Sequence, residues 1–281
     1  MIWSPPAYAW PAGKQAAACF SVDVDADAPY LWATRNGRSN TLAVPEHRSY
    51  GMRRGMARLV NLLDRLNIKG SFFVPGGVAE ANPDLLPGLL ERGHEIALHG
   101  YGHELVNDIS DQEFTEALEQ SIELFVKQTG QRPAGFRSPA WEMTPHMLAE
   151  LGRLGLWDSS LMGDDVPYTL QDISEIPVRW DIDDAIYFKF LGAGEAPPRS
   201  HLEIGAVWHS EAQAALRHGT LFMMTIHDWI CTRPARIEML EALWRPIVEN
   251  DGFWCATCGA LAAHHTRHVE DSHTPNDQGI S

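Results

Sequence analysis

Two histidines, His99 and His103, lie four residues apart in the segment HGYGHE, which follows the apolar residues 96–98. Residues four apart share one face of a helical turn, and the glycine beside each histidine lets the backbone bend close to an ion. The pair does not define a metal site by itself, because a lone histidine at a strand end is more often a hydrogen-bonded structural residue. A carboxylate from another strand would complete a two-histidine, one-carboxylate set, which is a common open catalytic metal site.

Two carboxylates, Asp23 and Asp25, stand in the segment SVDVD. Alternate residues of an extended strand point to the same side, so these carboxylates repel each other unless a cation separates their roles. A metal on one and Arg137 near the other would do this, and Arg137 lies among apolar residues in GFRSPAW, where a guanidinium needs a partner. The alternative, an Asp-rich turn after the strand, fits Asp27 better than Asp23.

His227 follows the apolar run LFMMTI, where a buried structural histidine is the default interpretation. Its position at a strand end, like that of Asp23, makes an acid–base role at least an equal interpretation. We expect Trp141 and Trp229 to help wall the same pocket, with core packing as the equal alternative.

Apolar, β-branched runs alternate with segments of helical period along the chain. We expect strands at residues 18–25, 70–76, 94–100, 134–140, 157–162, 174–180 and 220–229, with 252–258 as a further candidate, and helices at 52–67, 83–92, 111–129, 145–154, 203–218 and 235–250. Ser110 and Glu113 have the spacing of a capping box for the third helix. This alternation predicts an α/β fold with a mainly parallel sheet, doubly wound or closed as a barrel. Because the carboxyl ends of parallel strands lie on one face, the polar residues above should converge there.

Two long segments, residues 26–50 and 181–202, interrupt this alternation, and long loops in compact domains tend to be functional. We expect a single catalytic domain over residues 1–263 and a disordered polar tail over residues 264–281, whose histidines reflect composition. Cys255 and Cys258 form a CxxC with only the adjacent pair His264 and His265 as further ligands, so ordinary packing is favoured over a zinc site.

The composition excludes several classes of protein. The net charge of −15 and the lack of a basic cluster argue against a nucleic-acid binder. No stretch approaches the roughly 20 apolar residues of a membrane span, and the first residues lack the basic n-region of a signal peptide. Four cysteines are too few for a disulfide framework in a chain of 281 residues. We therefore expect a soluble, cytoplasmic protein.

In order and spacing, the segments SVDVD, HGYGHE, GFRSPAWE and TIHDW resemble the motifs of the polysaccharide deacetylase family, also called the NodB homology or carbohydrate esterase 4 family. The resemblance runs from about residue 17 to residue 229. It implies a deformed (β/α) barrel that hydrolyses amide bonds with a divalent metal, usually zinc. It further implies that the metal ligands are Asp25, His99 and His103, that Asp23 is the general base oriented by Arg137, and that His227 is the general acid.

The first motif departs from the commonest extracellular pattern of two adjacent aspartates followed by Gly-Pro, because Val24 separates the two carboxylates. This form resembles a cytoplasmic-type branch that includes peptidoglycan deacetylases, allantoinase-like proteins and cyclic imide hydrolases, often oligomeric. We expect N-deacetylation of an N-acetylated sugar or glycan, with ring opening of a small cyclic imide or ureide as the alternative. A third interpretation, a metal-binding homologue without catalysis, would need neither Asp23 nor His227.

Overall fold

The computed structural model describes residues 7–37, 41–192 and 194–273 of the chain. Its centre is a nine-stranded sheet in the order β6-β7-β5-β4-β3-β2-β1-β8, in which β9 pairs with the first residues of β1. The strands are β1 (Ala16–Asp23), β2 (Ser71–Val74), β3 (Glu95–Leu98), β4 (Gly135–Phe136), β5 (Trp157–Asp158), β6 (Tyr168–Leu170), β7 (Ile173–Glu175), β8 (Leu221–His227) and β9 (Phe253–Cys255). Every pair of these strands is parallel except β6 with β7.

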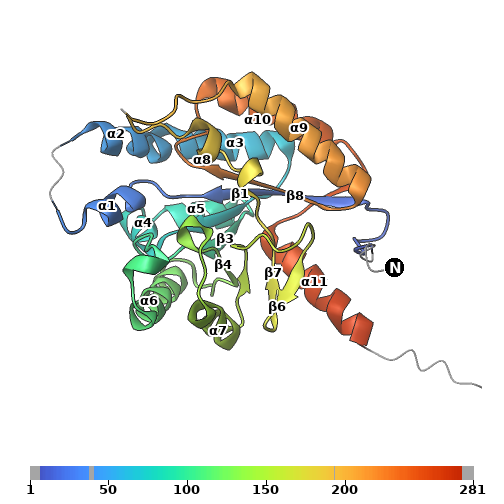
Figure 1. The fold of residues 1–281 in the computed structure, drawn as a ribbon, viewed down its shortest axis with the longest axis horizontal. Coiled ribbons are helices and arrows are strands. Elements are labelled where there is room, and N and C mark those ends of the chain that lie inside the picture. Colours follow the sequence, from blue (N-terminus) through green and yellow to red (C-terminus); the bar gives the residue numbers. More distant parts are fainter. Residues whose placement is uncertain (1–6, 38–40, 193, 274–281) are drawn as a thin grey trace, which may run out of the picture.

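Helices cover the sheet on both sides, with α3, α9 and α10 on one side and α6 and α7 on the other (Figure 1). The α-helices are α1 (Ala28–Thr34), α2 (Ala43–Tyr50), α3 (Met56–Leu66), α4 (Gly76–Ala81), α5 (Leu85–Glu91), α6 (Asp111–Thr129), α7 (Pro145–Leu154), α8 (Ala185–Phe188), α9 (His201–His218), α10 (Pro234–Val248) and α11 (Cys258–His273). The predicted capping box at Ser110 and Glu113 is present at the start of α6.

The sheet curls into the deformed (β/α) barrel that the resemblance of the motifs implies. Between β7 and β8 the ring is completed by irregular chain: Asp183 forms an isolated parallel bridge with Thr225 of β8, and the N–H of Asp184 donates to the Thr225 carbonyl at 3.2 Å. Strand β1 pairs with β2, β8 and β9, and all eight of its residues are buried, as expected of a parallel strand covered on both faces.

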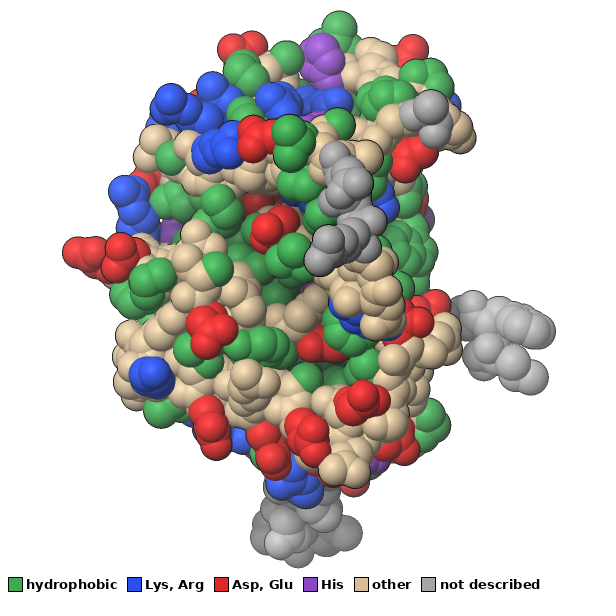
Figure 2. All heavy atoms as spheres, turned by 90° about the vertical axis from the view of Figure 1, so that its left-hand side faces the viewer, with side chains coloured by type: hydrophobic (Ala, Val, Ile, Leu, Met, Phe, Trp, Pro, Cys, Tyr) green, Lys and Arg blue, Asp and Glu red, His purple; other side chains and the backbone are tan. Residues whose placement is uncertain are grey.

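The register of the strands brings the polar strand ends together. Asp23 of β1 is paired with His227 of β8, and the N–H of Arg137 donates to the carbonyl of Leu98, the residue before His99, at 2.9 Å. Since all these strands are parallel, their carboxyl ends meet on one face of the molecule. That face is hollowed at its centre, and acidic side chains are visible in the hollow (Figure 2).

Several expected elements differ from those observed. Residues 26–50 contain α1 and α2, and residues 181–202 contain part of a 3-10 turn (Trp180–Ile182) and α8, while β6, α4 and α11 were not predicted. The strand expected at 134–140 ends at Phe136, after which a 3-10 turn over Pro139–Trp141 begins. Among the described helices none combines the length and apolarity that a membrane crossing requires.

The expectation of a disordered segment from residue 264 is wrong for residues 264–273, which continue α11. Side chains of this helix have specific partners: His264 Nε2 donates to the carbonyl of Ala9 at 2.7 Å, and the ring nitrogens of His265 lie 3.2 Å from the Tyr8 hydroxyl and 3.0 Å from the Thr169 hydroxyl. These contacts supply the free energy that ordering the segment needs. Residues 274–281 of the expected tail lie outside the described residues.

A π-helical turn, η1 (Gly51–Gly55), joins α2 to α3 and rests directly on the residue after His227. A Cβ atom added at Gly55 would lie 2.1 Å from the backbone carbonyl oxygen of Asp228. Such a contact forces the backbone to move. The close approach therefore holds the segment bearing Arg48 against the end of β8.

We predict that Gly55→Ala lowers the free energy of unfolding by about 1–3 kcal/mol, because the added methyl group cannot be accommodated against fixed backbone. The matched control is Gly88→Ala in α5, where nothing lies within 4 Å of an added Cβ. This control should be neutral or gain up to about 1 kcal/mol from helix propensity. Urea unfolding curves would measure both, and equal effects of the two substitutions would contradict the close approach.

Candidate active site

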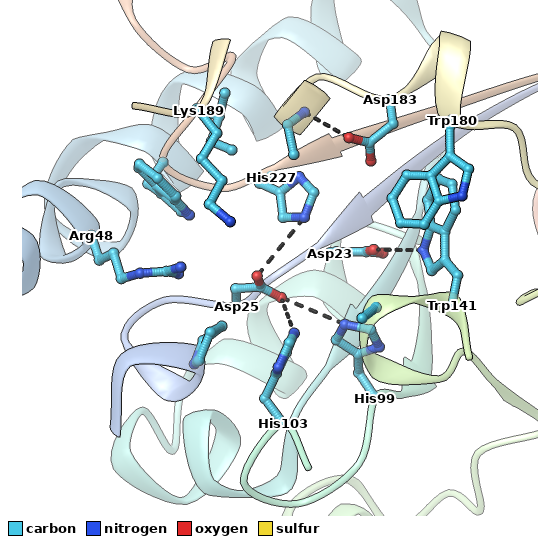
Figure 3. A pocket seen from close by; sticks show the side chains of 15 residues that line it. Asp23, Asp25, Arg48, His99, His103, Trp141, Trp180, Asp183, Lys189 and His227 are labelled. Carbon is cyan, nitrogen blue, oxygen red and sulfur yellow. Dashed lines mark hydrogen bonds and ion pairs between the residues drawn. The ribbon is translucent and has the colours of Figure 1, made fainter. Parts of the chain in front are cut away.

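A cavity of about 170 Å³ opens at the carboxyl ends of β1, β3 and β8. Its walls include Asp23, Asp25, Arg48, His99, His103, Trp141, Trp180, Asp183, Lys189, His227 and Trp229. The structure thus brings together every site residue expected from the sequence, with Arg137 directly behind Asp23. Figure 3 shows the two histidines and His227 arranged around Asp25.

Asp25, His99 and His103 form the candidate metal centre. The Nε2 atoms of His99 and His103 each lie 3.5 Å from Oδ1 of Asp25, and the three groups offer donor atoms within 4.8 Å of one another. Oδ1 of Asp25 is buried and has no hydrogen-bond partner among the described residues. A buried carboxylate oxygen without a partner is costly, and two imidazole nitrogens beside it form a donor set that suits a divalent cation. The residues present therefore fit a metal.

The turn after β3 explains the spacing of the two histidines. The carboxylate of Glu104 accepts hydrogen bonds from the N–H groups of Tyr101 and Gly102, at 2.9 and 2.6 Å. The turn also places His103 in the left-handed region, with φ of +62°. His99 donates from Nδ1 to the carbonyl of Arg137 at 2.8 Å, which leaves Nε2 free to act as a ligand.

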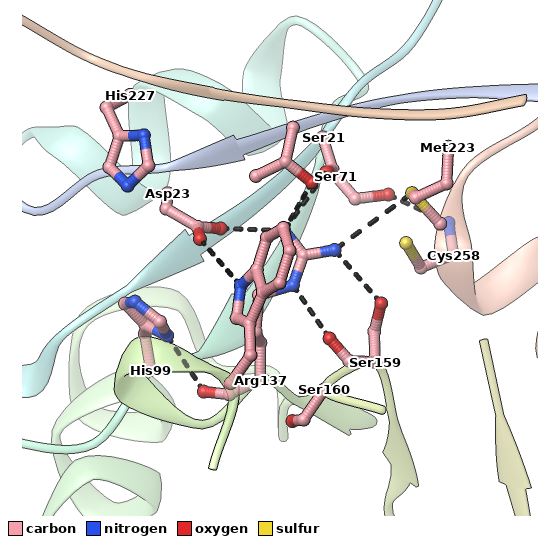
Figure 4. A network of polar contacts seen from close by, with 12 residues as sticks. Ser21, Asp23, Ser71, His99, Arg137, Ser159, Ser160, Met223, His227 and Cys258 are labelled. Carbon is pink, nitrogen blue, oxygen red and sulfur yellow. Dashed lines mark hydrogen bonds and ion pairs between the residues drawn. The ribbon is translucent and has the colours of Figure 1, made fainter. Parts of the chain in front are cut away.

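Asp23 is held by a fully buried arginine. Nη1 of Arg137 donates to Oδ1 of Asp23 at 2.7 Å, and the Trp141 indole donates to Oδ2 at 3.4 Å. Nη1 also donates to Ser21 Oγ at 3.0 Å, while Nε and Nη2 donate to the carbonyl and the Oγ of Ser159 at 2.8 and 2.9 Å (Figure 4). Burial alone would raise the pKa of Asp23, but Arg137, with His99 and His227, lowers it below its ordinary value.

His227 is oriented by a carboxylate that sequence reasoning missed. Oδ1 of Asp184 accepts a hydrogen bond from Nδ1 of His227 at 2.7 Å, and Oδ2 accepts from the N–H groups of His227 and Cys231 at 3.1 and 2.9 Å. Nε2 of His227 faces the cavity, 3.8 Å from Oδ2 of Asp25. Burial opposes a charge on this ring, yet Asp184 raises the pKa of His227 well above its ordinary value. The only signal in the sequence was that Asp184 lies in the long segment 181–202.

Asp183, Asp184 and His227 also lie close enough together to be considered as ligands. Both oxygens of Asp184 already accept hydrogen bonds, so this group is better explained as support for His227. Asp183 accepts from the N–H of Ala185 through Oδ1, while its buried Oδ2 has no partner among the described residues. Burial raises the pKa of Asp183 to about 7.

The aromatic walls agree with the expectation for Trp141 and Trp229, since both line the cavity. Trp141 stacks on Trp180, with ring centroids 4.2 Å apart and planes inclined by 27°.

Cys258 is buried with its Sγ 3.6 Å from that of Cys19. Neither Cys255 nor Cys258 belongs to a group of potential metal ligands in the described parts of the chain.

Behind Arg137, the buried carboxyl groups of Asp158 and Glu175 occupy paired positions of β5 and β7. The hydroxyl of Ser160 donates to Asp158 Oδ1 and accepts from the N–H of Ser138, both at 2.8 Å. The carboxyl pair therefore supports the segment that carries Arg137. Burial raises the pKa of both groups, and the adjacent Asp158 raises that of Glu175 further, well above its ordinary value.

Comparison with known proteins gives four consistent findings. The family model "Polysaccharide deacetylase" matches residues 49–157. A peptidoglycan deacetylase-like protein of Gibberella zeae, FGM2, is 34% identical over 80% of this chain and 65% of its own length, and a peptidoglycan deacetylase of Helicobacter pylori is 26% identical over 89% and 96%. A crystal structure of a putative polysaccharide deacetylase from Mycobacterium smegmatis superposes with a TM-score of 0.87 at 30% identity, covering 99% of this chain and 98% of that one.

We predict that Glu175 makes the protein less stable as the pH rises. Its pKa is raised in the folded protein, so its contribution to the free energy of unfolding is fully present below the ordinary value of 4.5 and is lost as the pH rises through the raised value. Glu175→Gln should therefore lose less stability than the wild type over the pH range that begins at 4.5 and extends upward. Urea midpoints across this range would test it, with the exposed Glu123→Gln as control. Parallel curves for the wild type and Glu175→Gln would contradict the prediction.

Proposed function

Because the chain belongs to the polysaccharide deacetylase family, we propose that it is a metal-dependent amide hydrolase that removes the acetyl group from an N-acetylated sugar or glycan. The observation that carries the proposal is the unpartnered carboxylate oxygen of Asp25 between two imidazoles. It lies in the same cavity as an ionised carboxylate and a protonatable histidine. The chain up to residue 263 would act as one catalytic domain.

Asp25, His99 and His103 would hold the metal, which we propose to be zinc because imidazole and carboxylate ligands suit it. When bound, the metal supplies Lewis acidity that polarises the amide carbonyl and makes water more acidic. Burial lowers the pKa of His103 to about 4, so that its ring is neutral and can act as a ligand at neutral pH.

Asp23 would be the general base. Its lowered pKa keeps it ionised at neutral pH, and Arg137 and Trp141 fix its two oxygens so that it can accept the proton of the attacking water. Arg137 does not reach the cavity itself and acts as a positioning residue. Trp141 would also form one wall for the substrate.

His227 would be the general acid. Since Asp184 holds Nδ1, the proton to be donated is on Nε2, which faces the cavity. Delivery of this proton to the amide nitrogen as the carbon–nitrogen bond breaks releases a neutral amine. The acetyl group leaves as acetic acid, which keeps the second proton of the attacking water and ionises in solution. Afterwards Asp23 carries the proton taken from water and His227 is neutral, so one proton has crossed the site.

The dimensions of the cavity bear on the substrate. Its volume of about 170 Å³ is below the roughly 300–1,000 Å³ of pockets for drug-sized ligands. Residues of both long segments, among them Arg48 and Lys189, contribute to its walls. This favours a single sugar residue over the interior of a polymer, and it keeps a second candidate, ring opening of a small cyclic imide or ureide.

Mass spectrometry of the products from a mixed panel would test the function. The panel would contain N-acetylated sugars and oligomers, cyclic imides and allantoin, incubated with zinc-loaded protein. A product lighter by one acetyl group supports deacetylation. A product heavier by one water supports the ring-opening candidate, and no change in any mass would overturn both.

We predict that Asp25→Ala and His99→Ala lose bound zinc, while Asp23→Asn retains it but loses turnover by about 10²–10⁴-fold, the usual contribution of a general base. Elemental analysis after gel filtration and rate measurements on the same samples would check this. Zinc retained by Asp25→Ala, or full activity in Asp23→Asn, would refute the assigned roles.

A separate prediction concerns Asp184. Asp184→Asn keeps the size of the side chain but removes the charge that stabilises protonated His227, so kcat should fall by about 10²-fold or more with a smaller change in KM. Zinc content and the thermal midpoint serve as controls, because a merely structural role would lower the midpoint without selectively changing kcat.

A further inference from the structure

One charged side chain in the cavity has no role in the proposed reaction. Arg48 of α2 is 5% exposed and lines the cavity. Its guanidinium points toward the centre of the cavity from the side opposite Trp141 and Trp180 (Figure 3). A buried guanidinium normally has its donors paired, so the partners of Arg48 indicate its purpose.

Those partners are few. Nη1 donates to the carbonyl of Ala26 at 3.2 Å, and the guanidinium carbon lies 4.7 Å from the centre of the Trp229 ring. Nε is buried without a hydrogen-bond partner, and no ion pair joins Arg48 to a carboxylate among the residues the structure describes. Arg137 in the same site is the opposite case, because each of its three nitrogens has a partner.

Two further donors lie near Arg48. The indole nitrogen of Trp229 is also buried without a partner in the described chain. Lys189, which follows α8, directs its ammonium group into the cavity on the same side as Arg48 (Figure 3). The Arg48 guanidinium and the Lys189 ammonium, two cationic groups on one wall of the cavity, would both be satisfied by a single anionic acceptor.

We propose that Arg48 and Lys189 form an anion-binding subsite. The substrate is then a small N-acetylated sugar that carries a carboxylate or a phosphate, an inference that rests on the proposed function. The scissile amide would lie at Asp25 and Asp23, the sugar ring would pack on the aromatic wall, and the anionic group would pair with the guanidinium, which binds either anion in a bidentate manner. The alternative is that Arg48 only balances the charge of Asp25 through space. In that case, replacing Arg48 would not change the preference of the site for charged over neutral substrates.

Three sugars serve as matched probes: N-acetylglucosamine, N-acetylmuramic acid, which adds a lactyl carboxylate, and N-acetylglucosamine 6-phosphate. Binding would be measured by calorimetry on zinc-loaded Asp23→Asn, so that it is independent of turnover. We expect at least one anionic sugar to bind at least about tenfold more tightly than the neutral one. The sugar that does so identifies whether the subsite prefers a carboxylate or a phosphate. Equal affinities for all three would overturn the proposal.

The same measurements on Arg48→Met in this background should reduce the ratio of anionic to neutral affinity to about one, and Arg48→Lys should retain part of it. Lys189→Met, at an exposed position, should lower the ratio by a few-fold and covers the case in which Arg48→Met does not fold. Lys127→Met on the exposed side of α6 is the control and should leave the ratio unchanged. Equal weakening of all three sugars by Arg48→Met would show that Arg48 acts only on the metal centre.

Hydrolysis by the wild type, followed in parallel, separates the two proposals. An affinity preference for the anionic sugar without release of acetate would refute the proposed function and leave the subsite standing. Release of acetate from all three sugars with equal kcat/KM would support the proposed function and refute the subsite.

Discussion

The site depends on one buried ion pair, between Arg137 and Asp23. Burying two charges is costly unless their remaining hydrogen-bonding groups are satisfied, and here Ser21, Ser159 and the Trp141 indole satisfy them. These partners come from different strands and from the turn after β4, so the pair forms only when the sheet is assembled. The arrangement fixes a carboxylate beside the candidate metal ligands before any substrate arrives, which is the preorganisation that catalysis needs.

Four aspartates at this end of the barrel are almost equally buried, yet their pKa values move in opposite directions. Despite burial, the pKa of Asp23 is lowered by the Arg137 guanidinium and that of Asp25 by the imidazoles of His103, His99 and His227, all within about 4 Å. Burial raises the pKa of Asp183 and Asp228 to about 7, since neither has such a partner within that distance. Proximity to a cation, more than depth, therefore decides which carboxylates are charged at neutral pH. The result is a cavity whose walls hold two ionised carboxylates, Asp23 and Asp25, and one protonatable carboxylate, Asp183.

The motifs of the sequence predicted the residues of this site well, because Asp23, His99, Arg137 and His227 all lie at the ends of parallel strands, where fold class alone fixes the face. Asp184 and Arg48 were missed for the opposite reason. They come from segments without period-2 or period-3.6 patterns, whose positions depend on tertiary contacts such as the Asp183–Thr225 bridge. Strand lengths were overestimated where hydrogen bonds to side chains take the place of backbone hydrogen bonds between strands. An example is Ser160, whose hydroxyl donates to Asp158 instead of continuing β5. The helical residues after His264 were missed because their partners, Tyr8 and Thr169, are distant in sequence.

The left-handed backbone of His103 has an implication for how this protein can change. A residue with a side chain in that conformation costs about 1–2 kcal/mol relative to glycine, so at this position the requirement for a stable turn and the requirement for an imidazole conflict. Selection for stability alone would favour glycine there, and only the metal-binding role proposed for His103 favours histidine. If His103 holds a metal, as proposed, gains in thermal stability at this position would be traded against retention of function. A lineage that no longer needed that metal would then be expected to lose this histidine early.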